Sequence, residues 1–111
     1  MQLDLLDRAY IDGPDPVTQG ILECIAGDRL HERDREAIVT AIRASVRYDG
    51  TVSANDWRPQ IPTWVYPKVI GATVNALTKA GHLTPTGEWV ISDDVHGRNC
   101  GKPMRLYRWS A

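Results

Sequence analysis

The chain contains few of the residues that mark secreted proteins or metal sites. Its 111 residues include two cysteines, Cys24 and Cys100, which lie far apart and have no partner at the spacing of metal ligands. A secreted domain of this length more often contains several cysteines that pair as disulfides. We therefore expect a cytoplasmic protein.

Long apolar segments are also missing. No run approaches the roughly 20 apolar residues that a helix needs to cross a bilayer. The first residues, Met1 to Asp4, are not a basic patch followed by an apolar run, which is the pattern of a signal peptide. These observations favour a protein without a membrane partner.

The sequence lacks the short motifs of common enzyme classes. It contains no GxGxxG, no phosphate-binding P-loop, no His-Glu-x-x-His and no nucleophile elbow. His96 and Cys100 stand four residues apart with His82 as a third candidate, but a zinc site needs about four ligands. Asp93 and Asp94 are adjacent carboxylates without a third acid in a matching motif. We expect no catalysis, no cofactor and no metal.

What the sequence does contain is the composition of one ordinary globular domain. Hydrophobic residues make up 42% and charged residues 24%, and this length is enough for a single modest core. The charge is divided unevenly. Residues 1–56 hold 6 Lys/Arg and 11 Asp/Glu, whereas residues 57–111 hold 7 Lys/Arg and 3 Asp/Glu. A polyanionic partner is therefore expected to contact the C-terminal half.

A Gly-Pro-Asp-Pro sequence at residues 13–16 interrupts the chain after a leucine-rich start. Residues 1–15 are therefore predicted to form an N-terminal peptide and linker. Asp15 is a candidate N-cap, with proline at the first position of a helix over 16–26. Residues 16–33 would then be an accessory helical segment in front of the main domain.

The main domain, residues 34–111, begins with helical periodicity. A helix over 34–47 is predicted from the apolar stripe of Ile38, Val39, Ile42 and Val46. A capping box at 53–56 predicts a short second helix. A third helix is predicted over 67–80 and ends at Gly81, with a buried stripe of Ile70, Val74 and Leu77.

The periodicity changes to two after Gly81. Residues 88–92 and 104–109 read as strands, with a polar loop over 93–103 between them. Thr51 and Val52 form a short extended piece ahead of the second helix. The predicted order is helix, short strand, short helix, helix and hairpin.

Several segments at matching places show a resemblance to a known family: Thr51–Asp56, Gly71-Ala72, Leu77–Leu83, Gly87–Trp89 and Gly101–Pro103. Residues 34–109 resemble winged helix-turn-helix proteins, and look most like small winged-helix proteins encoded by bacteriophages of actinobacteria. The resemblance implies an α+β winged helix, with a three-helix core and a β-hairpin wing. The segment at 16–33 would be an added N-terminal helix.

The resemblance also implies that the third helix enters the major groove of duplex DNA while the wing contacts the backbone or minor groove. Asn75 could read an adenine edge, and Lys68 a guanine or a phosphate. Gly71 and Ala72 would let the backbone approach the duplex closely. The face opposite the expected core carries Lys68, Ala72, Asn75 and Lys79, and wing contacts to phosphates are expected from His96, Arg98, Asn99, Lys102 and Arg105.

The expected function is therefore duplex-DNA binding in transcription or replication, without catalysis. An alternative stays open, because exposed lysines also merely solvate helices and this fold also serves as a protein-docking module. The accessory helix could pair two copies, so a homodimer is left open as well.

Four tryptophans raise a separate question, because indole rings can stack on bases. In a domain without phenylalanine, such rings more often fill the core. We predict that Trp89 and Trp109 are core residues of the hairpin and that Trp57 is also a core residue. Trp64 and Tyr66, beside the third helix, are the aromatic residues expected to be exposed.

The N-terminal residues Gln2, Leu3, Asp4, Leu5 and Leu6 resemble the bacterial sliding-clamp-binding motif, Gln-Leu-Ser/Asp-Leu-Phe/Leu. In an extended peptide the glutamine would hydrogen-bond at one subsite and the leucines would anchor in the apolar pocket. A chain end before a Pro/Gly linker suits such docking. The sliding clamp is thus the alternative partner, unless these leucines pack on the domain's own core.

Overall fold

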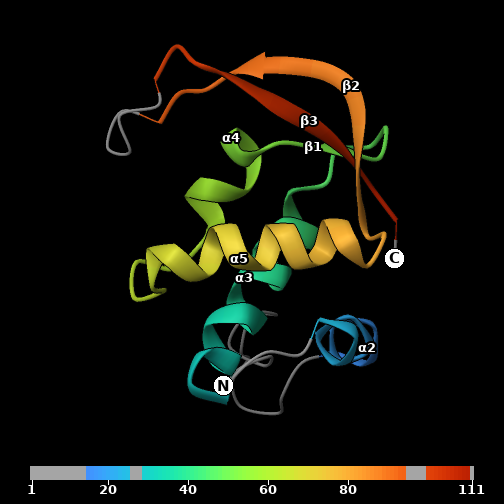
Figure 1. Cartoon of the computed structure of the whole chain (residues 1–111), viewed down its shortest axis with the longest axis vertical. Coiled ribbons are helices and arrows are strands. Elements are labelled where there is room, and N and C mark those ends of the chain that lie inside the picture. The colour runs from blue at the N-terminus through green and yellow to red at the C-terminus, as the bar shows by residue number, and fades with distance from the viewer. Residues whose placement is uncertain (1–14, 26–28, 95–99, 111) are drawn as a thin grey trace, which may run out of the picture.

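A computed structural model describes residues 15–25, 29–94 and 100–110, and Figure 1 shows how their elements are arranged. The sheet lies on one side, α5 and α3 cross the middle, and α2 lies on the side away from the sheet. The described part contains four α-helices, two short 3-10 helices and three strands: α2 (Pro16–Cys24), η1 (Arg29–His31), α3 (Glu32–Ser45), β1 (Thr51–Val52), α4 (Ala54–Trp57), η2 (Arg58–Gln60), α5 (Pro67–Lys79), β2 (Leu83–Ile91) and β3 (Pro103–Trp109).

Helix α2 begins where the sequence predicts. The Asp15 carboxylate accepts hydrogen bonds from the backbone N–H groups of Val17 and Thr18, both at 3.0 Å. The same carboxylate pairs with Arg43 of α3 at 3.0 Å. Hydrogen bonding from the Thr18 backbone lowers the pKa of Asp15, opposed by partial burial and assisted by Arg43. One residue therefore caps α2 and joins it to α3.

The core lies between α2, α3, α5 and the sheet. Ile38 and Ile42 of α3 are fully buried, as are Val52 of β1 and Leu77 of α5. Ile21 of α2 is buried in the same cluster. Helix α3 starts two residues earlier than predicted and ends at Ser45, so Val46 follows the helix and is partly buried.

The buried face of α5 differs from the predicted one. Val69, Thr73 and Leu77 are its buried residues, whereas Ile70 and Val74 are only partly buried. Residues at spacing i, i+4 form a ridge that packs against α3, which leaves the neighbouring row at the edge of the core. The prediction holds for Leu77 and was wrong for the rest of the stripe, which is Val69 and Thr73, the latter with its side chain 1% exposed.

The three strands form an antiparallel sheet in the order β1-β3-β2. The register pairs Pro85 with Tyr107 and Trp89 with Arg105, so three β2 residues lie opposite Leu106 alone. Gly87 supplies the left-handed backbone of this bulge, with φ of +90°. The predicted strand covers only the part of β2 beyond the bulge.

The bulge decides the exposure of the hairpin tryptophans. Trp89, beyond the bulge, is 58% exposed, so the prediction that it belongs to the core was wrong. Trp109 pairs with Leu83, on the part of β2 that precedes the bulge. It packs against the core and stacks on His82 with ring centroids 6.0 Å apart. Trp57 is buried, while Trp64 and Tyr66 are 49% and 48% exposed, as predicted.

This α+β arrangement is compatible with the predicted winged-helix plan, with α3, α4 and α5 as its helices and β2–β3 as its hairpin. The capping box is confirmed, because the Ser53 N–H donates to Asp56 at 2.8 Å. No helix in the described ranges is long and apolar enough to span a membrane. The clamp-motif residues Gln2–Leu6 lie outside the described residues.

Candidate nucleic-acid interface

A groove of about 500 Å³ separates α5 from the hairpin and the α4–η2 segment. We call it the α5–hairpin groove. Its lining comes from four elements and two loops: Ala54, Trp57, Arg58, Ile61, Pro67, Ile70, Gly71, Val74, Asn75, Asp94, Met104, Arg105 and Tyr107. The groove thus joins residues from parts of the sequence that are up to 53 positions apart.

The floor of the groove is apolar and belongs to the edge of the core. Trp57 is 4% exposed, and its ring lies 6.2 Å from that of Tyr107. Ile70 and Val74, which the sequence assigned to the core, line the groove from α5. Among the described lining residues, those with strongly polar side chains are Arg58, Asn75, Asp94 and Arg105, while Trp57 and Tyr107 each have one polar group on an aromatic ring.

The predicted recognition face of α5 is exposed, but only part of it lines the groove. Gly71 and Asn75 do so. Lys68, Ala72 and Lys79 are exposed on the same helix outside the groove lining. A Cβ added to Gly71 would meet no atom within 4 Å, so packing does not require glycine there.

Two of the predicted wing residues lie in the described part of the hairpin. Lys102 is exposed next to β3. Arg105 is exposed on β3, lines the groove, and has its guanidinium 5.3 Å from the centre of the Trp89 ring. His96, Arg98 and Asn99 lie outside the described residues.

Sequence reasoning missed Asn55 and Arg58, which fasten the hairpin to α4. The Asn55 amide donates to the Ile91 carbonyl at 2.8 Å and accepts from the Asp93 N–H at 3.0 Å. Arg58 pairs with Asp93 at 2.8 Å and with Asp94 at 3.8 Å. These partners are 35 to 38 positions away, so no local pattern could have indicated them.

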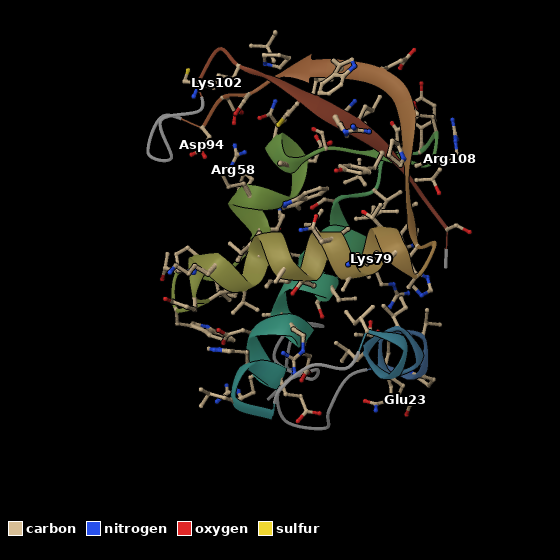
Figure 2. All side chains as sticks on the ribbon, viewed as in Figure 1. Glu23, Arg58, Lys79, Asp94, Lys102 and Arg108 are labelled. Atoms are coloured by element: carbon tan, nitrogen blue, oxygen red, sulfur yellow. The ribbon has the colours of Figure 1, made fainter. Side chains whose placement is uncertain are left out.

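Figure 2 shows how the labelled charges are distributed. Arg58, Asp94 and Lys102 gather at one end of the hairpin, and Arg108 lies at its other end. Lys79 projects from α5 between these two ends, whereas Glu23 lies on α2 on the far side from the sheet. The four labelled cations therefore lie on the side of α5 and the sheet, all within the half of the sequence that has the excess of positive charge.

Three carboxyl groups in the described ranges have shifted pKa values, and none of them lines the groove. Besides Asp15, the Thr51 hydroxyl and backbone lower the pKa of Asp49 by hydrogen bonding, and burial raises the pKa of Glu36. The two lowered groups hold a helix start and a turn before β1. His82, the third candidate metal ligand in the sequence, has its Nδ1 3.0 Å from the Ser110 carbonyl oxygen.

Comparison of the chain with protein-family models, with curated proteins and with solved structures finds no match.

Proposed function

We propose that this protein is a winged-helix domain that binds duplex DNA, with α5 as the recognition helix and β2–β3 as the wing. The observation that supports this most directly is the convergence of Asn75 from α5 and Arg105 from β3 on one groove. These two residues were selected on separate grounds, as a base reader and a phosphate contact, and they face the same space.

The dimensions and charges of α5 agree with this proposal. Thirteen residues give the helix a length of about 20 Å, and the major groove, roughly 12 Å wide, admits a helix. Lys68 and Lys79 lie near the two ends of the helix, where they would reach phosphates on either side of Asn75. Gly71 and Ala72 leave its middle without long side chains.

The experiment is fluorescence anisotropy of a labelled duplex titrated with protein across a salt series. Affinity should fall steeply with salt, because phosphate contacts release counterions. Lys68→Gln should weaken binding and lower the salt slope by about one. The matched control is Gln19→Glu, at an exposed position of α2, which changes the net charge by the same amount on a different helix. Equal losses in both variants, or no binding at low salt, would contradict the proposal.

The sliding clamp stays a predicted second partner, since Gln2–Leu6 lie outside the described residues. Its test is co-elution of the protein with purified bacterial clamp. Gln2→Ala combined with Leu5→Ala should abolish co-elution, and unchanged co-elution would remove the prediction.

A further inference from the structure

The hairpin exposes the ring of Trp89, which has no role in the phosphate contacts proposed above. Trp89 is 58% exposed and Ile91, two residues further on the same strand, is 64% exposed. Alternate residues of a strand share a face, so the two side chains form one apolar surface beyond the bulge. Contiguous exposed apolar groups on a small domain indicate a contact surface.

The bulge and Arg105 hold the Trp89 side chain in place. The Thr86 hydroxyl donates to the Leu106 carbonyl at 3.0 Å and accepts from the Glu88 N–H at 3.1 Å, which satisfies the backbone across the bulge. Trp89 follows at once and is paired with Arg105, whose guanidinium lies over the indole. The ring is therefore presented from a paired strand rather than from a loose loop.

Arg105 connects the Trp89 ring with the α5–hairpin groove. Arg105 contacts Trp89 and also lines the groove together with Asn75 and Gly71. Lys102 adds a second cation on the same hairpin. The carboxylate that reaches the groove, Asp94, is paired with Arg58. The surroundings of the ring thus suit a polyanion that also has flat apolar faces.

We propose that Trp89 stacks on an unpaired base, so that the preferred ligand is duplex DNA that adjoins unpaired nucleotides. This inference rests on the proposed duplex binding and narrows it. In the interior of a duplex the faces of the bases are covered by their neighbours, whereas an unpaired base offers its face to an aromatic ring. An arginine beside the ring adds a cation–π contribution to such stacking.

The experiment compares a blunt duplex with the same duplex bearing a short thymine overhang, on either strand end. We expect the full-length protein to bind one of the overhang probes about tenfold more tightly than the blunt duplex. Trp89→Ala should lose this preference and keep the affinity for the blunt duplex. Trp89→Phe should retain part of the preference, because phenyl also stacks.

A matched control is Trp64→Ala. Trp64 is 49% exposed and also lies under an arginine, with Arg33 5.4 Å from its ring centre, but it does not line the groove. Its removal should leave the preference for the overhang unchanged. Thermal unfolding of each variant separates a loss of stacking from a loss of folded protein.

A second readout needs no variant. With 2-aminopurine as the first unpaired base, stacking on the indole should quench its fluorescence in the wild-type complex.

Equal affinity for blunt and overhang probes without quenching would overturn the inference and leave duplex binding intact. Equal weakening of both probes by Trp89→Ala would overturn it too, because the ring would then act on paired DNA. A Trp89-dependent dimer in sedimentation equilibrium, without a probe preference, would assign the surface to a second copy. Absence of any DNA binding would remove both proposals.

Discussion

Two tryptophan–arginine pairs lie on the surface, and their surroundings differ. Trp89 and Trp64 are 58% and 49% exposed, with arginines 5.3 Å and 5.4 Å from their rings. Trp64 borders a hollow of about 520 Å³ that Glu32 and Asp34 also line. Arg105 lines a groove of similar volume beside Asn75. Both sites combine an exposed indole with an arginine. The charges of the residues around each pair therefore decide which of them suits a polyanion.

The acidic surroundings of Trp64 have a structural origin. Asp34 accepts the backbone N–H of Tyr66 at 3.1 Å, at the start of α5. A carboxylate is favourable there because helix N-termini carry partial positive charge. His31 stacks on Tyr66 and lies 3.5 Å from Asp34. Asp34 therefore holds the start of α5 to α3, and together with Glu32 it makes the hollow beside Trp64 less favourable for DNA than the α5–hairpin groove.

The largest expected effect comes from a substitution in the core, on which both tryptophan–arginine surfaces depend. Leu77 is fully buried and holds α5 against the core. Leu77→Ala should lower the free energy of unfolding by about 2–5 kcal/mol, because the cavity adds to the lost burial. Urea denaturation followed by tryptophan fluorescence measures this. A loss below 1 kcal/mol, roughly that of an exposed site, would mean that α5 is not packed as described.

Charge reversal compares the two pairs directly. Arg105→Glu should weaken duplex binding by about tenfold, because a phosphate contact is replaced by repulsion. Arg33→Glu makes the same change of charge beside Trp64 and should leave duplex affinity nearly unaltered. Anisotropy at one salt concentration measures both. A larger loss for Arg33→Glu would move the interface to the surface around Trp64.

Asp15 tests the structural role of the acidic half. Asp15→Ala should cost about 1 kcal/mol at neutral pH, because the N-cap of α2 is lost. The pKa of Asp15 is lowered in the folded state, so its contribution is present above the unfolded pKa and disappears as pH falls through the folded one. Urea unfolding of both proteins should therefore converge at strongly acid pH. A constant difference over the whole range would contradict this.

The smallest expected effect concerns Gly71 in the groove. Because its helical backbone has room for a Cβ, Gly71→Ala should raise stability by up to about 1 kcal/mol. The same methyl group should weaken duplex binding if α5 approaches the bases closely. Gly81→Ala is the contrast, since its φ of +87° makes alanine strained and destabilising by about 1 kcal/mol. Thermal unfolding and anisotropy measure both variants.

Local signals in the sequence predicted where elements begin and end. Asp15 with Pro16, the capping box at Ser53–Asp56 and the left-handed Gly81 all lie where the structure has them. Each depends on residues within about four positions of one another, so it can be predicted from a short stretch of sequence. The candidate site was predicted in part for the same reason: Asn75 and Arg105 were selected from a helix face and a strand.

Other features depended on partners far along the chain. The row of Val69, Thr73 and Leu77 is buried because α3 packs there, which periodicity alone could not distinguish from the neighbouring row. Arg58 finds Asp93 and Asp94 only after the hairpin folds over α4.

The sequence by itself determined the kinds of element, their caps and the positive charge of the C-terminal half. The tertiary structure alone decided that Asn75 and Arg105 share a groove and that Trp89, which contacts Arg105, is exposed. Hydrogen bonds between residues a few positions apart, such as helix caps, are determined by the local sequence. The side of a helix or strand that faces solvent is settled by whichever distant surface packs against the other side.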